Sequence, residues 1–241
     1  MTFQGDLFKG KVAVVTGGTS GIGGAAATAL AALGAEVHAV GLGTAEYHAP
    51  AGAAITAHEL DVTDDKGVAA LIDGLPRLDM LVNCAGTIRR AAEHELDVFE
   101  QVVAVNLTGT MRTCTAARAK LAQTKGSIVN TASMLSFFGA GQGPGYSASK
   151  GGVMQLTKSL AIAYAADGIR VNAVAPGWIM TSLTQVLQQD ATRSSHITGR
   201  TPLGRWGKPE EVAGAIVFLC SPAAGFITGT ILPVDGGYLV T

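Results

Sequence analysis

Short, almost continuously apolar runs alternate along the chain with longer segments in which apolar residues recur at helical spacing. Such runs are typical of strands buried on both faces of a parallel sheet, and the longer segments predict helices that cover it. The predicted strands are Val12–Thr16, Glu36–Gly41, Ala54–Glu59, Met80–Asn83, Ser127–Thr131, Arg170–Ala173 and Ile231–Val234. The predicted helices are Gly21–Leu33, Asp64–Gly74, Val98–Leu121, Tyr146–Ala166, Leu183–Ser194 and Pro209–Leu219. The pattern predicts an α/β chain with an open, doubly wound parallel sheet.

One connection in this repeating pattern is too rich in glycine and proline for a full helix. Leu42–Ala53 contains Gly43, Pro50 and Gly52, so we expect an irregular crossover there. Since no linker or low-complexity tract divides the chain, residues 1–241 are predicted to form a single domain. The excursion over residues 176–205 is where a substrate lid is expected.

Composition narrows the possible partners. The 241 residues are 48% hydrophobic and include 17 Lys+Arg against 18 Asp+Glu, a net charge of -1. This balance disfavours a nucleic-acid or anionic-membrane partner, and no apolar run reaches the roughly 18 residues of a membrane span. The three cysteines are scattered and form no metal-ligand cluster. We therefore expect a cytoplasmic protein with reduced thiols, no metal site and a small-molecule substrate.

A glycine-rich turn directly follows the first predicted strand. It comprises Gly17, Thr19, Ser20, Gly21, Ile22 and Gly23 in a GxxxGxG pattern, and an alanine-rich helix comes next. Free N–H groups at a helix N-terminus bind phosphate, and glycine lets the phosphate approach the backbone. The turn therefore predicts a dinucleotide site. A purely structural turn is the alternative.

Two further strand ends carry candidate cofactor contacts. Asp61 and Val62 follow the third strand, where Asp61 could accept a hydrogen bond from an adenine amino group. The alternative for Asp61 is an acidic residue that caps the next helix. Asn83, Ala85 and Gly86 follow the fourth strand, and their small size would let a ribose or nicotinamide pass.

Tyr146 and Lys150 lie four residues apart on a predicted helix, so their side chains share one face. An adjacent ammonium is expected to lower the pKa of the phenol and to make it a usable proton donor and acceptor. A surface pair without function is the alternative. Ser133, predicted to end the fifth strand, would lie at the same sheet edge and could hold a substrate oxygen.

Taken together, these residues resemble the classical short-chain dehydrogenase/reductase family. The resemblance rests on TGxxxGxG (Thr16–Gly23), Asn83–Gly86, Asn106, Ser133, Tyr146–Lys150 and Pro176–Gly177, in the family's order. It implies a Rossmann fold and hydride transfer to or from a nicotinamide cofactor. By the same resemblance, Tyr146 is the general acid/base, Lys150 lowers its pKa and binds ribose, Ser133 orients the reacting oxygen and Asn106 supports a water relay. Pro176, Gly177, Ile179 and Thr181 would line the nicotinamide side. A homotetramer is also implied, with a monomer as the alternative.

The chain departs from the family pattern at the position that selects the cofactor. NAD-dependent members carry an Asp after the second strand, whereas this chain has Gly41. Members that use NADP supply a nearby cation, which Ser20, Leu42 and Gly43 do not. Because a phosphate would lack a cationic partner, we expect a weak preference for NAD, with NADP not excluded. Cys84 replaces a usual Asn and is interpreted as a small buried residue.

The substrate prediction rests on Arg89 and Arg90, which follow the Asn83–Gly86 segment. Within the family this segment resembles that of sugar-acid dehydrogenases, and an arginine there could bind a carboxylate. Solvated loop charges are the alternative for both arginines. A reductase of 3-oxoacyl thioesters is the alternative enzyme, and a non-catalytic nucleotide-binding regulator is the alternative of another class.

Overall fold

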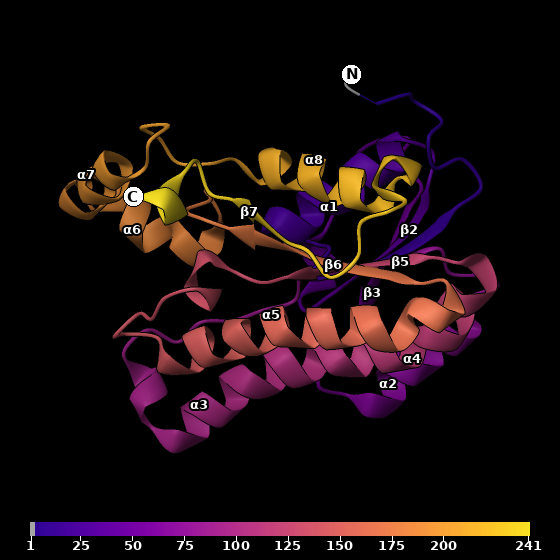
Figure 1. Cartoon of the computed structure of the whole chain (residues 1–241), viewed down its shortest axis with the longest axis horizontal. Coiled ribbons are helices and arrows are strands. Elements are labelled where there is room, and N and C mark those ends of the chain that lie inside the picture. The colour runs from indigo at the N-terminus through magenta and orange to yellow at the C-terminus, as the bar shows by residue number, and fades with distance from the viewer. Residues whose placement is uncertain (1–2) are drawn as a thin grey trace.

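A computed structural model describes residues 3–241, and the first two residues of the predicted domain lie outside the described part. Seven parallel strands form one sheet in the order β3-β2-β1-β4-β5-β6-β7 (Figure 1). This is the predicted doubly wound Rossmann sheet, and all seven predicted strands are confirmed. The strands are β1 (Val12–Thr16), β2 (Glu36–Gly41), β3 (Ile55–Glu59), β4 (Met80–Asn83), β5 (Ser127–Thr131), β6 (Arg170–Pro176) and β7 (Ile231–Val234).

Helices cover both faces of the sheet (Figure 1). α1 (Gly21–Ala32) and α8 (Pro209–Cys220) pack on one face, and α2 (Asp65–Gly74), α4 (Gly109–Thr124) and α5 (Pro144–Tyr164) pack on the other. Successive strand residues point to opposite faces, so Ala13 and Val15 join the α1–α8 core whereas Val14 joins the other core. This two-sided burial explains why the strands are almost continuously apolar.

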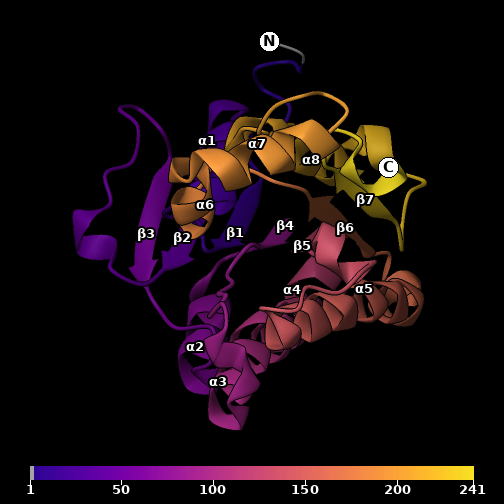
Figure 2. The same cartoon turned by 90° about the vertical axis from the view of Figure 1, so that its left-hand side faces the viewer.

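The strand order reverses beside β1, which pairs with β2 on one side and with β4 on the other. In open α/β sheets a crevice forms at the carboxyl ends of the strands at such a point, and ligands bind there. α6 (Gln185–Gln189) and α7 (Ala191–Arg200) belong to the 176–205 excursion. They lie together at the left-hand end of the molecule in Figure 1, the end that faces the viewer in Figure 2.

Two connections between strands and helices differ in how regular they are. The crossover after β2 holds only a 3₁₀ turn, η1 (Thr44–Glu46), which confirms the absence of a full helix. The predicted helix Leu183–Ser194 is wrong, because the segment divides into the 3₁₀ turn η6 (Ser182–Thr184), α6 and α7. Asp190 causes the break, since its backbone is extended and its side chain accepts from the Arg193 amide at 3.0 Å.

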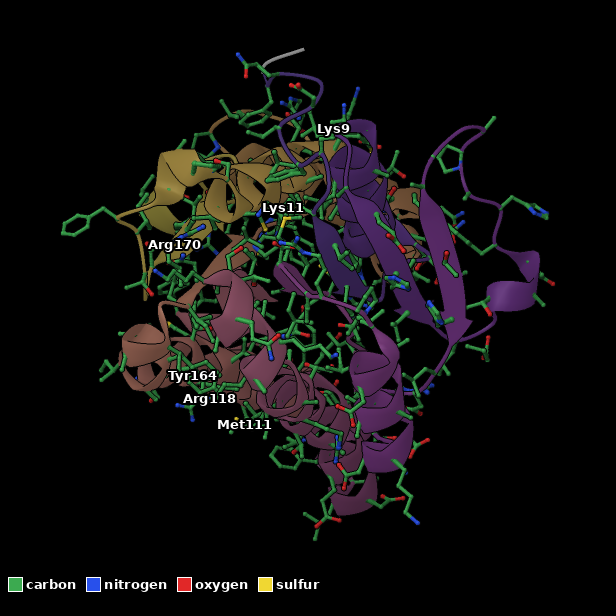
Figure 3. The ribbon with its side chains drawn as sticks, turned by 90° about the vertical axis from the view of Figure 1, so that its right-hand side faces the viewer. Lys9, Lys11, Met111, Arg118, Tyr164 and Arg170 are labelled. Atoms are coloured by element: carbon green, nitrogen blue, oxygen red, sulfur yellow. The ribbon has the colours of Figure 1, made fainter. Side chains whose placement is uncertain are left out.

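The predicted helix Val98–Leu121 is also more complex than expected. It comprises α3 (Leu96–Val103), a π-helical turn η3 (Ala104–Thr108) and α4. Where α4 passes α5, the Arg118 guanidinium lies 4.6 Å from the centre of the Tyr164 ring (Figure 3). A π-helical turn frequently marks a functional position, and this one carries Asn106.

Within residues 3–241, no helix combines the length and the apolar content needed to cross a bilayer.

Candidate active site

The glycine turn after β1 is closely packed against the end of β4. Gly17 has φ +64°, and a Cβ there would lie 2.8 Å from the Ala85 nitrogen. A Cβ on Gly23 would lie 2.2 Å from the Gly17 carbonyl oxygen. Close packing is therefore enough to explain why both positions are glycine. This is what the alternative of a purely structural turn predicts.

The start of α1 supplies the evidence for an anion site at this turn. The N-cap Ser20 makes no side-chain hydrogen bond to the first turn, so N–H groups there stay available to a ligand. Thr181 lies over this end of the helix, with its Cγ2 3.4 Å from where a Cβ of Gly21 would be. The pyrophosphate of a dinucleotide fits this arrangement of small residues, free amides and positive helix end.

The structure places Asp61 and Asn83 in different settings. Asp61 is half-buried and accepts from the Thr63 amide at 2.8 Å, whereas Asp64 caps α2. One oxygen of Asp61 thus stabilises a turn before the helix, and Val62 beside it is buried. The Asn83 side chain points into the core, where it donates to Asn130 Oδ1 at 2.9 Å and accepts from Thr113 Oγ1 at 2.8 Å. Only the backbone of Asn83 is therefore left for a cofactor.

Tyr146 and Lys150 lie on the inner face of α5, so the alternative of a surface pair is wrong. Lys150 is 4% exposed, and its Nζ lies 5.6 Å from the Tyr146 ring centre. The ammonium donates to the Thr131 carbonyl oxygen at 2.6 Å. Its Nζ also lies 3.7 Å from where a Cβ of Gly86 would be. The end of β4, the end of β5 and α5 thus meet at this lysine.

Burial governs the proton chemistry of this pair. It raises the pKa of Tyr146, and this effect outweighs the opposing hydrogen bond from Ser133 and the charge of Arg90. Burial thus opposes the lowering of the tyrosine pKa that its spacing from Lys150 predicts, and the Lys150 ammonium is hydrogen-bonded to the Thr131 carbonyl. Burial also lowers the pKa of Lys150, to about 8.

Ser133 lies two residues beyond β5, not at its end as predicted. It is the N-cap of the 3₁₀ turn η4 (Met134–Ser136), and its Oγ accepts from the Leu135 amide at 3.1 Å. This local bond orients the hydroxyl, and the residue as a whole is 6% exposed. Ser133 and Tyr146 line the same cavity.

Asn106 braces the loop that follows β4. Its Nδ2 donates to the Thr87 carbonyl at 2.9 Å and to Ser149 Oγ at 3.0 Å, and its Oδ1 accepts from the Thr87 amide at 2.8 Å. Its main-chain carbonyl accepts from Thr110 Oγ1 at 2.8 Å. The side chain is fully buried, so in this structure it holds the backbone beside Lys150 in place.

A cavity of about 640 Å³ lies at the carboxyl ends of the strands. It brings together eight of the predicted site residues, which come from five separate parts of the chain: Ile22, Arg90, Ser133, Tyr146, Pro176, Gly177, Ile179 and Thr181. The two arginines predicted to bind substrate, Arg89 and Arg90, differ in their position relative to this cavity. Arg90 lines the cavity and donates from Nη1 to the Leu183 carbonyl at 3.1 Å. Arg89 is exposed and lies outside the lining, as the solvated-charge alternative expects.

Comparison with known proteins agrees with this geometry. Residues 17–239 match a protein-family model described as Enoyl-(Acyl carrier protein) reductase. The chain is 41% identical to the 2-dehydro-3-deoxy-D-gluconate 5-dehydrogenase of Pseudoalteromonas atlantica, over 96% of each chain. It is 45% identical to the cis-4-hydroxycyclohexanecarboxylate dehydrogenase of Sinomonas cyclohexanicum, over 98% of this chain and 99% of the relative. A gluconate 5-dehydrogenase from Burkholderia cenocepacia, solved with NADP and tartrate, has a TM-score of 0.91 and 34% identity over 98% of both chains.

The chain belongs to the short-chain dehydrogenase/reductase family. This short-chain dehydrogenase/reductase is an NAD(P)-dependent oxidoreductase that interconverts a secondary alcohol and a ketone by hydride transfer. When bound, the nicotinamide supplies or accepts the hydride, and the protein must handle the accompanying proton. The free amides of α1 and the space beside Gly86 fit such a cofactor.

Some residues of the site have no signal in the sequence of this short-chain dehydrogenase/reductase. Glu93 is 1% exposed and accepts from the Tyr146 amide, but nothing distinguishes it from the exposed Glu95 and Glu100 in the printed chain. Arg193 and His196, from α7, line the cavity opposite the catalytic helix. Their position at the cavity depends on how α7 packs in the tertiary structure. The helical pattern of the sequence does not show this packing.

Cys84 is partly buried, and it packs against the core on the α1–α8 side of the sheet. Its Sγ accepts from Thr131 Oγ1 at 3.2 Å, and burial raises the pKa of the thiol to about 11. A thiol in this state is a poor nucleophile at neutral pH. Among residues 3–241, no group of three or more His, Cys, Asp or Glu side chains could hold a metal ion.

Proposed function

We propose that this enzyme oxidises and reduces a small substrate that carries a carboxylate, with sugar acids as the first class to test. The basic side chains that line the cavity carry the proposal. Arg90, Arg193 and His196 line it together with Tyr146, and no Asp or Glu does so among the residues that the structure describes. The guanidinium groups of Arg90 and Arg193 would attract an anionic substrate to this wall. A guanidinium can bind its carboxylate through two hydrogen bonds.

In this proposal Tyr146 transfers the proton and Ser133 holds the reacting oxygen. A buried phenol with a raised pKa stays protonated at neutral pH, which suits donation to the oxygen of a ketone undergoing reduction. Lys150 would stabilise the charge that develops and bind the ribose, because its ammonium lies beneath the tyrosine ring. Asn106 would support the proton path by fixing the backbone at Thr87.

The proposed cofactor contacts are small residues and strand ends that lie at the carboxyl edge of the sheet. The pyrophosphate would lie at Gly17–Gly23, the adenine at Asp61 and Val62, and the nicotinamide side at Asn83, Ala85, Gly86 and the Pro176–Thr181 segment. Residues 176–205 would act as the lid, since Arg90 already joins this segment through the Leu183 carbonyl.

A weak preference for NAD is also proposed, on the charge that borders the turn after β2. Glu59 accepts from the amides of Gly43 and Thr44 at 3.0 and 2.7 Å, and from Thr44 Oγ1 at 2.8 Å. The hydrogen bonds from Thr44, and then from Gly43, lower the pKa of Glu59. A carboxylate at the turn beside Gly41 would disfavour the additional phosphate of NADP. The Burkholderia relative was solved with NADP, so both cofactors belong in the assay.

A second substrate class follows from the apolar part of the cavity wall. Ile88, Leu135, Leu183 and Leu187 line it alongside Arg90, Arg193 and His196. Apolar walls with a few polar groups suit a ligand that has an apolar body and one charged end. An alicyclic hydroxy acid, the substrate type in the name of the Sinomonas relative, is therefore the second candidate.

Two further expectations concern the state of the protein. We propose a homotetramer, supported by apolar side chains such as Met111 on α4, Ile162 on α5 and Phe226, which are 39%, 81% and 105% exposed. Light scattering tests this. We also propose a cytoplasmic location, supported by the free thiols of Cys84, Cys114 and Cys220. Fractionation of cells that express the protein tests it.

The deciding experiment measures kcat/KM with NAD(H) and NADP(H) over sugar acids, cis-4-hydroxycyclohexanecarboxylate, neutral polyols and acetoacetyl thioesters. The proposal expects carboxylate substrates to be turned over best. Arg90→Met should raise their KM by about tenfold or more, because it removes a charge-assisted pair. Arg89→Met is the matched control and should change KM little. Turnover of thioesters alone would support the 3-oxoacyl thioester reductase, and nucleotide binding without any turnover would support the regulator.

A further inference from the structure

Glu93 is a buried acidic residue for which the proton and hydride chemistry gives no role. It lies in the 3₁₀ turn η2 (Ala92–His94) and is 1% exposed. No Lys, Arg or His forms an ion pair with it among residues 3–241. Burying a carboxylate without a counter-charge is costly unless hydrogen bonds replace its water. The partners of its two oxygens therefore indicate what the residue does.

Both partners are backbone amides, one in α5 and one in the loop that precedes Arg90. Oε2 accepts from the Tyr146 amide at 2.8 Å, and Oε1 accepts from the Arg89 amide at 2.7 Å. Tyr146 lies in the first turn of α5, where amides have no partner within the helix. The N-cap of α5 is Gly143, which has no side chain, and the next residue is Pro144. Glu93 thus caps α5 from 53 residues away in the sequence, where the helix dipole favours its negative charge.

The second oxygen holds the loop that carries Arg90. This loop is also attached at Thr87, through Asn106, and at Ala91, whose amide donates to the Gln142 carbonyl at 2.8 Å. Ala91 has φ +64°, a conformation that residues other than glycine rarely adopt. Such backbone persists where the surrounding contacts over-determine it.

We propose that Glu93 is a positioning residue that couples the Arg90 loop to the first turn of α5, so that Tyr146 and the substrate-binding arginine keep a fixed separation. The inference rests on the proposed function of the cavity. It assigns to Glu93 no contact with the reacting atoms. A carboxylate is suited to this role because it presents two acceptors to two N–H donors. A carboxamide of the same shape offers only one oxygen, and its NH₂ group would face an amide N–H.

The negative charge of Glu93 also affects the pKa of Tyr146, which a residue that only fills space would not do. Glu93 raises the pKa of Tyr146 whereas Arg90 lowers it. The other basic side chains near the tyrosine are Lys150, whose Nζ lies 5.6 Å from the ring centre, and Arg193 and His196, which line the same cavity. Replacing Glu93 with Gln leaves these groups in place and removes one negative charge. The tyrosine pKa should therefore fall.

The test compares Glu93→Gln, Glu93→Asp and the exposed control Glu100→Gln with the wild-type enzyme. Glu93→Gln should lower kcat by about tenfold, as expected for a lost hydrogen bond to a buried charge. It should leave dinucleotide affinity nearly unchanged and move the pH profile of kcat/KM to lower pH. Glu93→Asp keeps the charge but shortens the side chain, so it should lower kcat with a smaller shift of the profile.

Hydrogen exchange supplies a readout that needs no substrate. In Glu93→Gln the amides of residues 87–91 and 144–148 should both exchange faster, and in Glu100→Gln neither should. Wild-type kcat, exchange and pH profile in Glu93→Gln would overturn the proposal, as would faster exchange in one of the two segments alone. If the wild-type enzyme turns over no carboxylate substrate, the proposed function fails, while the exchange result still decides the role of Glu93.

Discussion

Gly23→Ala is the substitution that most directly tests how the turn after β1 works. The new Cβ would lie 2.2 Å from the Gly17 carbonyl oxygen, 2.7 Å from the Gly17 carbonyl carbon and 3.0 Å from Cys84 Cβ. A relaxed C···O contact is about 3.3 Å, so the backbone at Gly17 or the start of α1 must move by about 1 Å. Gly17 has no room to retreat, because its own Cα already faces the backbone of Cys84 and Ala85.

The cost of this movement should appear in cofactor binding as well as in stability. Overpacking of this kind costs about 1–3 kcal/mol. If the displaced turn is the one that binds pyrophosphate, the same energy weakens dinucleotide binding by about 5- to 150-fold. Titration calorimetry with NAD(H) and NADP(H) measures the affinity, and thermal unfolding measures the stability.

Gly24→Ala is the matched control, one residue along the same helix. Its Cβ would lie 3.5 Å from the nearest atom, an ordinary contact, and alanine favours a helix interior by about 0.5–1 kcal/mol over glycine. Gly24→Ala should therefore bind the cofactor normally and unfold at the same or a higher temperature. Equal affinity in the two variants would refute the argument that close packing at Gly23 shapes the phosphate site.

Two further predictions concern proton transfer and acid stability. Tyr146→Phe should abolish turnover with cofactor affinity nearly intact, because it removes only the hydroxyl; activity assays and calorimetry check this, and wild-type turnover would remove the assignment. At Asp79, burial raises the carboxyl pKa, but hydrogen bonds from Arg77, the Val12 amide and Lys11 outweigh it and lower the pKa overall. An aspartate in an unfolded chain has a pKa of about 4. Because the pKa of Asp79 is lower in the folded state, its carboxylate stabilises the fold above about pH 4, and this stabilisation is lost as the pH falls further. Asp79→Asn should thus be about 1–3 kcal/mol less stable at pH 7, with the difference from wild type shrinking on acidification in urea unfolding; a difference independent of pH would contradict this.

The sequence by itself determined the strands, their parallel arrangement and the order of the chemical groups. Residues such as Val14 and Val15 are apolar on both faces of the strand because helices cover both sides, and this signal is local. Tyr146 and Lys150 could be paired from their spacing on one helix for the same reason. The missing helix after β2 was visible in its own glycines and proline.

Only the tertiary structure decided which groups enter the cavity and how their environment changes them. Arg89 and Arg90 are adjacent and chemically identical, yet only Arg90 lines the cavity. Glu93 becomes a cap for α5 because folding brings together residues 53 positions apart. Burial raises the pKa of Tyr146, although the local pattern predicted a lower value. These outcomes depend on desolvation and long-range contacts, which exist only once the chain has packed, whereas strand and helix patterns are carried by neighbouring residues.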